Sequence, residues 1–212
     1  MMFINLISIL FSLTLATAAA HLPSLATATR LPNSGAYLNS EGSPLFPLLE
    51  NAKSSIDIEI YTMKSTTVRN LIRKALARSV QVRIIQEPDP VGEKCKVFGD
   101  ATATSADLSA EAIDCADEQK LVNDVRKAGG AYVPFAKSTL CGQDAAHCLQ
   151  HGKIAVIDGL AMVSTGNFDA TNLCLAKENP AKCDRDFSLV LDDQQITNSL
   201  ERIFEADLAG DA

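Results

Sequence analysis

The chain has 212 residues, 47% of them hydrophobic, and carries a formal net charge of −7 at pH 7. Proteins that bind nucleic acid broadly are usually basic, so this acidic balance argues against such a protein. The chain has no Trp and only 5% aromatic residues, which gives no sign of a base-stacking platform or of an interfacial membrane anchor. Its length is enough for one hydrophobic core.

The first segment, MMFINLISILFSLTLATAAA, carries no charged side chain and ends in small residues. This composition resembles a secretory signal peptide, and the polar residues within it favour cleavage over retention as an uncleaved membrane anchor. We therefore predict a signal peptide at 1–20, a leader segment at 21–34 and a mature protein that is secreted or periplasmic.

In the first half of the mature chain, hydrophobic periodicity alternates between strand and helix. Isoleucines at every second position, Ile56, Ile58 and Ile60, predict a strand, and the apolar stripe from Val68 to Leu76 has helical spacing. The expected elements are a strand in GAYLNS, a helix in SPLFPLLENAKSS, this strand, this helix and a strand in VQVRIIQE. The basic residues of the second helix are interpreted as a solvated surface, with a basic patch as the alternative: Arg69, Arg73, Lys74 and Arg78.

The second half begins with a polar stretch that contains several Pro and Gly residues, which we interpret as an insertion near 88–116 beside the active site. The elements expected after it are a helix at 118–127, a strand in AYVPF, a β-hairpin that turns at Asp158-Gly159, a strand in SLVLDD and a terminal helix with Asp193 as its N-cap. This order of strands and helices predicts an α/β fold in a single domain over 35–212.

Six cysteines follow the predicted signal peptide, and an even number favours disulfides in an exported protein. We predict the local set of pairs, because each bridge then closes one irregular loop between elements. These pairs are Cys95 with Cys115, Cys141 with Cys148, and Cys174 with Cys183. Zinc binding is the alternative, although the sequence contains no C-x2-C pair.

The polar residues of the hairpin are the strongest functional signal. His151 and Lys153 lie two apart on one predicted strand and therefore point to the same face. Asn167 ends the returning strand, which brings its side chain near the strand that starts at His151. An imidazole nucleophile, a fixed cation and a donor amide suit a phosphodiester substrate.

The segment HGKIAVIDGLAMVSTGNFD resembles the catalytic H-x-K-x4-D motif of the phospholipase D superfamily. Matches to NAKSSIDIEIYTM, VRNLIRKALARSVQVRIIQE and DRDFSLVLDD extend the resemblance over most of the mature chain. The family more often has a Ser after the motif's Gly and an Asn two residues later, whereas Asn167 directly follows Gly166 here. The resemblance implies a mixed central sheet flanked by helices and a phosphodiesterase that uses no metal or other cofactor.

The resemblance also implies a role for each matching residue. His151 would attack phosphorus to form a phosphohistidine, and Lys153 and Asn167 would hold the non-bridging oxygens. Asp158 would stabilise the hairpin rather than touch the substrate. Asp186 would orient the His151 ring by accepting a hydrogen bond from it.

The family's chemistry needs two motifs that face each other, one His as nucleophile and one as general acid, but this chain has one complete motif. Single-motif members form homodimers about a two-fold axis, so we predict a homodimer that brings two copies of His151 together. The acidic charge ranks a phospholipid substrate first and a nucleic acid, as for a secreted endonuclease, second. A catalytically silent domain that binds anions or a partner is a further alternative, which the intact His151, Lys153 and Asn167 disfavour.

Overall fold

The computed structural model describes residues 32–98, 109–142, 147–175, 178 and 182–210. The predicted signal peptide at 1–20 lies outside the described residues, as do residues 21–31 of the leader at 21–34 and residues 99–108 of the insertion near 88–116. Within the described ranges, no helix is both long enough and apolar enough to cross a bilayer.

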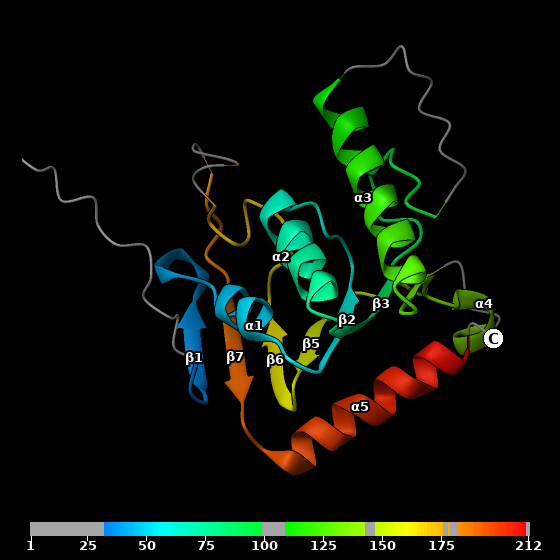
Figure 1. Ribbon diagram of the computed structural model, residues 1–212. Coiled ribbons are helices and arrows are strands. Elements are labelled where there is room, and N and C mark those ends of the chain that lie inside the picture. Colours follow the sequence, from blue (N-terminus) through cyan, green and yellow to red (C-terminus); the bar gives the residue numbers. More distant parts are fainter. Residues whose placement is uncertain (1–31, 99–108, 143–146, 176–177, 179–181, 211–212) are drawn as a thin grey trace, which may run out of the picture.

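A seven-stranded mixed sheet forms the centre of the molecule, with helices on both faces (Figure 1). The strands are β1 (Gly35–Leu38), β2 (Ser55–Ile60), β3 (Gln81–Gln86), β4 (Ala131–Pro134), β5 (Lys153–Ile157), β6 (Leu160–Ser164) and β7 (Phe187–Leu191). Their spatial order is β1-β7-β6-β5-β2-β3-β4. Strands β2, β3 and β4 are parallel, and the other neighbours are antiparallel. The predicted α/β fold with a mixed central sheet is confirmed.

Side-chain caps explain where two of the helices begin. The helices are α1 (Leu45–Asn51), α2 (Thr66–Ala77), α3 (Ala110–Lys127), the short α4 (Lys137–Leu140) and α5 (Gln194–Ala209). Asp193 caps α5 as predicted, since its carboxylate accepts hydrogen bonds from backbone N–H groups of the first turn. Helix α3 begins at Ala110 rather than at Glu118, because the Ser109 hydroxyl accepts from the Ala112 N–H and extends the helix into the expected insertion.

The two faces of the sheet differ in chemistry. The alternating isoleucines of β2 lie in the hydrophobic core with residues of α1 and α2. On the opposite face Asp57 and Glu59 are also buried. Arg83 bridges Asp57 to Glu205 of α5, which packs on this second face. Strand β2 is therefore buried on both sides, and on the second face the ion pairs lie beside buried apolar residues, which include Ile85, Val156 and Phe204.

The interpretation of the basic residues of α2 as a solvated surface was wrong for Arg69 and Arg73, and these two do not form a basic patch. Arg69 is 0% exposed and pairs with Asp114 and Asp117 of α3. Arg73 pairs with Asp117 and Asp124 of the same helix. Helices α2 and α3 lie side by side in Figure 1, and these ion pairs connect them. The carboxylates neutralise both arginines, whereas Lys74 and Arg78 of the same group are exposed, as the interpretation expected.

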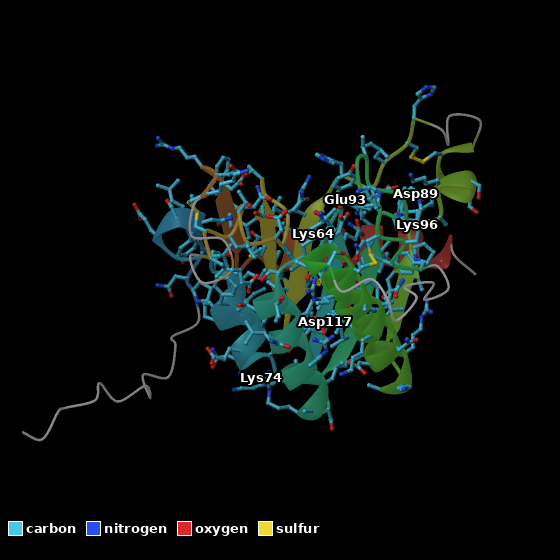
Figure 2. All side chains as sticks on the ribbon, turned by 90° about the horizontal axis from the view of Figure 1, so that it is seen from above. Lys64, Lys74, Asp89, Glu93, Lys96 and Asp117 are labelled. Carbon is cyan, nitrogen blue, oxygen red and sulfur yellow. A yellow bond between two sulfur atoms is a disulfide. The ribbon has the colours of Figure 1, made fainter. Side chains whose placement is uncertain are left out.

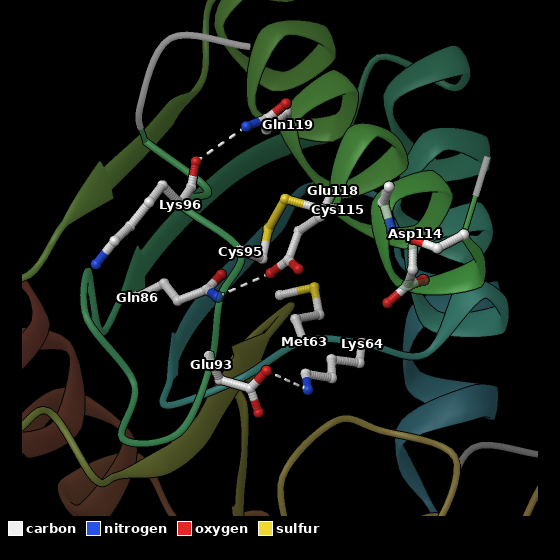
Figure 3. The surroundings of a disulfide bond; sticks show 12 residues. Met63, Lys64, Gln86, Glu93, Cys95, Lys96, Asp114, Cys115, Glu118 and Gln119 are labelled. Atoms are coloured by element: carbon white, nitrogen blue, oxygen red, sulfur yellow. Dashed lines mark hydrogen bonds and ion pairs between the residues drawn. A yellow bond between two sulfur atoms is a disulfide. The ribbon is translucent and has the colours of Figure 1, made fainter. Parts of the chain in front are cut away.

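The predicted local disulfides are confirmed. The pairs, with their Cα–Cα distances, are Cys95–Cys115 (5.5 Å), Cys141–Cys148 (6.2 Å) and Cys174–Cys183 (4.7 Å). Figure 3 shows the first pair, which joins the loop after β3 to α3 beside Met63 and Glu118. The second pair closes the loop before β5, and the third closes the loop between β6 and β7. All three therefore stabilise irregular segments rather than the sheet.

Candidate active site

Asp158 anchors the turn of the β5–β6 hairpin. Asp158 has a φ of 49° and Gly159 a φ of 83°, so the predicted two-residue turn is formed. The Asp158 carboxylate accepts hydrogen bonds from the backbone N–H groups of Lys53, Ser54 and Ser55 at 2.7, 2.8 and 3.0 Å. Although burial acts to raise it, these bonds lower the pKa of Asp158. Asp158 therefore fastens the hairpin to the start of β2.

His151 and Lys153 lie at the opposite end of the sheet from this turn. Strand β5 runs antiparallel to β2 and places Lys153 opposite Ile60, the last residue of β2. The ammonium of Lys153 is 3.0 Å from Nδ1 of His151 and donates a hydrogen bond to the His151 carbonyl at 2.7 Å. The Tyr61 ring packs edge-on against the imidazole, with the centroids 4.8 Å apart. The structure thus brings the predicted imidazole and cation together.

The imidazole of this pair is exposed, whereas the lysine is buried. Lys153 is only 6% exposed, and no carboxylate within the described ranges forms a salt bridge with it. The Tyr61 ring, 5.7 Å from the ammonium, is its aromatic neighbour. Burial lowers the pKa of Lys153, and Asp186 acts in the opposite direction. Partial burial and then the charge of Lys153 lower the pKa of His151, which favours the neutral form of the imidazole.

Asn167 reaches the same end of the sheet as His151. It follows β6, which runs antiparallel to β5, and the neighbouring Phe168 donates its N–H to the Thr62 carbonyl at 3.2 Å. The Oδ1 atom of Asn167 is buried and has no hydrogen-bond partner in the described part of the chain. A buried polar atom without a partner destabilises the free protein unless water or a ligand satisfies it.

Asp186 holds the segment that leads to Asn167. Its carboxylate accepts hydrogen bonds from Thr165 Oγ1 and Asn172 Nδ2, both at 2.7 Å. A Cβ atom at Gly166 would lie 2.7 Å from Cγ of Asp186, so this approach requires glycine. Among the hydrogen bonds of the described residues, none joins Asp186 to the His151 ring. The orienting contact that the resemblance implies is therefore not among these bonds. The charge of Asp186 only partly opposes the lowering of the pKa of Lys153, which burial causes.

Sequence interpretation missed several residues of this site. Tyr61 has a weak signal, since it directly follows the alternating strand β2. Thr165 precedes the motif's Gly166, but its hydrogen bond to Asp186 forms only because β6 pairs with β7, which the local sequence does not show. Gln150, which precedes His151, has no local signal, because its partner Glu59 is 91 residues away.

Charged loops surround the end of the sheet at which His151 lies. Lys64, after β2, pairs with Glu93, and Lys96 pairs with Asp89 in the loop after β3. Figure 2 labels both pairs in a view from above, and Figure 3 shows the first pair in detail. Both of these lysines have a carboxylate partner, in contrast to Lys153.

Within the described ranges, neither a metal-binding cluster nor the open cavity beside α5 involves the hairpin's motif residues. The described residues contain no group of three or more metal-binding side chains. An open cavity of about 960 Å³ lies between α5 and the starts of β2 and β3. Arg83 lines it, and Asp57 and Glu205 neutralise the charge of that arginine. The cavity contains none of the hairpin's motif residues.

Comparison with known proteins agrees with this architecture. Residues 45–208, well over half of the chain, match the family model described as "Cardiolipin synthase, PLD-like domain". The solved structure of the phospholipase D family member Nuc from Salmonella typhimurium is similar, with a TM-score of 0.55 and 15% identity over 85% of this chain and 96% of that chain. NucT from Helicobacter pylori has a TM-score of 0.57 and 13% identity over 84% and 96% of the two chains. No curated protein matches the sequence. The family match and the shared fold show that the chain belongs to the phospholipase D superfamily, in the family of cardiolipin synthase PLD-like domains.

Proposed function

We propose that the protein is an exported, metal-independent phosphodiesterase that hydrolyses phospholipids through a phosphohistidine at His151, as a homodimer. The observation that supports this most strongly is the buried ammonium of Lys153, which has no carboxylate partner among the described residues and lies 3.0 Å from the imidazole of His151. A buried cation without a partner is costly, so the site favours an anion. A phosphodiester supplies that anion together with an electrophilic phosphorus.

In the first step, a ring nitrogen of His151 forms a bond to phosphorus as the bond between phosphorus and the leaving oxygen breaks. The ammonium of Lys153 turns from the imidazole to a non-bridging oxygen, and the Asn167 amide donates to the phosphoryl group as negative charge builds. His151 of the partner subunit, in its protonated imidazolium form, donates a proton to the leaving oxygen and becomes neutral. The products of this step are a free alcohol and a phosphohistidine.

In the second step, water attacks phosphorus while the partner's His151 takes its proton. The bond between phosphorus and nitrogen breaks, which releases a phosphomonoester and restores the neutral His151. Asp158 holds the hairpin turn throughout, and Asp186 holds the segment before Asn167 through its hydrogen bond with Thr165. The cycle needs no electron transfer and no metal ion.

Two further observations support export and pairing of subunits. Three disulfides fit an oxidising compartment better than the cytosol. The chain contains one H-x-K-x4-D motif, so a second catalytic imidazole has to come from a second copy. The acidic net charge of −7 favours a phospholipid over a nucleic acid.

The test compares the oxidised mature protein with His151→Ala and with a matched control, His147→Ala, in EDTA. His147 is exposed in the loop before β5. With bis(p-nitrophenyl) phosphate as substrate, we expect wild type and the His147 variant to be active and the His151 variant to fall to background. Acid quenching should leave a phosphoryl adduct on the peptide that contains His151.

Activity that requires a divalent metal, or that persists in His151→Ala, would contradict the mechanism. Phosphatidylcholine vesicles and single-stranded DNA then distinguish the substrates under the same conditions. If DNA is cleaved and no lipid headgroup is released, the proposed substrate becomes a nucleic acid instead of a phospholipid. Gel filtration with light scattering measures whether the active species is the dimer.

A further inference from the structure

Gln150, the residue before the proposed nucleophile, is bound on three sides. It is buried although the loop that contains it is neither helix nor strand. Its backbone N–H donates to Glu87 at 2.9 Å, and its side-chain Nε2 donates to Glu59 at 2.7 Å. Its Oε1 accepts from the Gly152 N–H at 2.5 Å. The amide of Gln150 therefore reaches across His151 and holds the residue on its other side.

Both carboxylates that hold Gln150 come from the rigid centre of the sheet. Glu59 lies in β2, which pairs with β3 on one side and with β5 on the other. Glu87 directly follows β3, is 0% exposed and forms an ion pair with Lys137. Through Gln150, the irregular loop that presents His151 is thus connected to two central strands.

We infer that Gln150 is a positioning residue for His151: its amide, fixed by Glu59, sets the backbone on both sides of the imidazole and so the direction from which the ring approaches phosphorus. The inference rests on the proposed phosphohistidine function. Gln150 itself touches no reacting atom. The amide of Gln150 donates to Glu59 and accepts from Gly152 at the same time, which neither an ionised carboxylate nor an apolar side chain can do. Without this hydrogen bond, Gly152 has wide backbone freedom next to the nucleophile.

Loss of this contact should affect turnover more than substrate binding. The proposed phosphate ligands, Lys153 and Asn167, belong to β5 and to the segment after β6, and no hydrogen bond connects their side chains to Gln150 in the described residues. A misplacement of about 1 Å in a reacting group costs roughly 10²-fold in rate. We expect Gln150→Met to lower kcat by roughly 10- to 100-fold with little change in KM.

Three variants separate positioning from general damage to the fold. Gln150→Met removes both ends of the amide, whereas Q150E keeps the acceptor for Gly152 but places a second carboxylate against Glu59. The double variant E59Q/Q150E exchanges the two groups, so one donor and one acceptor again face each other and Gly152 keeps its acceptor. The matched control is Gln119→Met on α3, because the Gln119 amide also donates to one partner, the Lys96 carbonyl at 2.9 Å (Figure 3), and has no hydrogen bond to a motif residue within the described ranges.

The experiment measures kcat and KM with bis(p-nitrophenyl) phosphate for wild type and these variants, together with hydrogen exchange of the Gly152 amide by NMR. We expect low kcat and faster Gly152 exchange in Gln150→Met and Q150E, at least roughly ten-fold recovery of kcat in E59Q/Q150E over Q150E, and wild-type behaviour in Gln119→Met. A wild-type kcat in Gln150→Met, or no recovery in the exchanged pair, would overturn the positioning role.

A failure of the proposed function is distinguishable from a failure of this inference. Wild type that is no more active than His151→Ala overturns the phosphohistidine function. The exchange of the Gly152 amide is independent of activity: if this amide is unprotected in wild type, the contact with Gln150 is absent and the positioning inference is overturned by itself.

Discussion

Replacement of Asp158 tests whether the aspartate of the motif serves the fold or the chemistry. In Asp158→Ala, the N–H groups of Lys53, Ser54 and Ser55 lose their acceptor, and an alanine has to adopt a φ of 49°. Each lost hydrogen bond costs about 0.5–1.5 kcal/mol, and the left-handed backbone costs an alanine roughly 1 kcal/mol. Water replaces part of the acceptor at this surface, so we expect a loss of about 3 kcal/mol in the free energy of unfolding.

Asp158→Asn is the matched control, because asparagine tolerates a positive φ and keeps one acceptor oxygen. It should lose about 1 kcal/mol. Urea unfolding of the oxidised proteins measures both losses, and a loss of about 3 kcal/mol corresponds to a Tm lower by roughly 6–12 °C. Turnover of the folded variants should stay close to wild type, because the turn and His151 lie at opposite ends of the sheet. An Asp158→Ala protein of unchanged stability but with no turnover would refute this reasoning.

Three more substitutions test the electrostatics and packing of the molecule. Burial raises the pKa of Glu118, which is 4% exposed, from 4.5 to about 7, so the folded protein retains a proton that the unfolded chain releases. The free energy of unfolding should therefore fall by roughly 3 kcal/mol as the pH rises from about 4.5 to 7. Glu118→Gln should remove this contribution to the pH dependence, which urea titrations at a series of pH values measure. Lys153→Met should raise the free energy of unfolding by removing a buried cation without a carboxylate partner, yet lower kcat by about 10²–10³-fold; a less stable variant with normal turnover would contradict the proposed site. Gly166→Ala should displace Asp186 and Asn172, whose atoms lie 2.7 Å from the added Cβ. We expect a lower Tm in thermal melts and a lower kcat in turnover assays. Unchanged values would show that the close packing of Gly166 against Asp186 is not needed.

Elements whose determinants lie close together in the sequence were predicted well. The alternating isoleucines of β2, the Asp158-Gly159 turn and the Asp193 cap each depend on a few neighbouring residues. The early start of α3 was missed, because a single cap at Ser109 extends the helix through a polar stretch without an apolar stripe. The burial of Arg69 was also missed, because its partners lie 45 and 48 residues further along the chain.

The residues of the candidate site also differ in how far the local sequence predicts them. His151 and Lys153 share one strand, and their spacing alone predicts a common face. The contacts of Asp186 with Thr165 and Asn172 require β7 to pair with β6, which no local pattern in the sequence shows. Periodicity and turn chemistry therefore locate the hairpin, but the residues that support it depend on strand order.

Both edges of the sheet are poorly suited to adding another strand. In the described part of the chain, the edge strands β1 and β4 have only four residues each. Strand β4 ends at Pro134, which has no N–H to donate to a neighbouring strand. We therefore expect two copies to associate through the loops at the His151 end rather than by forming a continuous sheet. The same short edges also offer little template for strand-to-strand aggregation while the disulfides of a newly made chain are still forming.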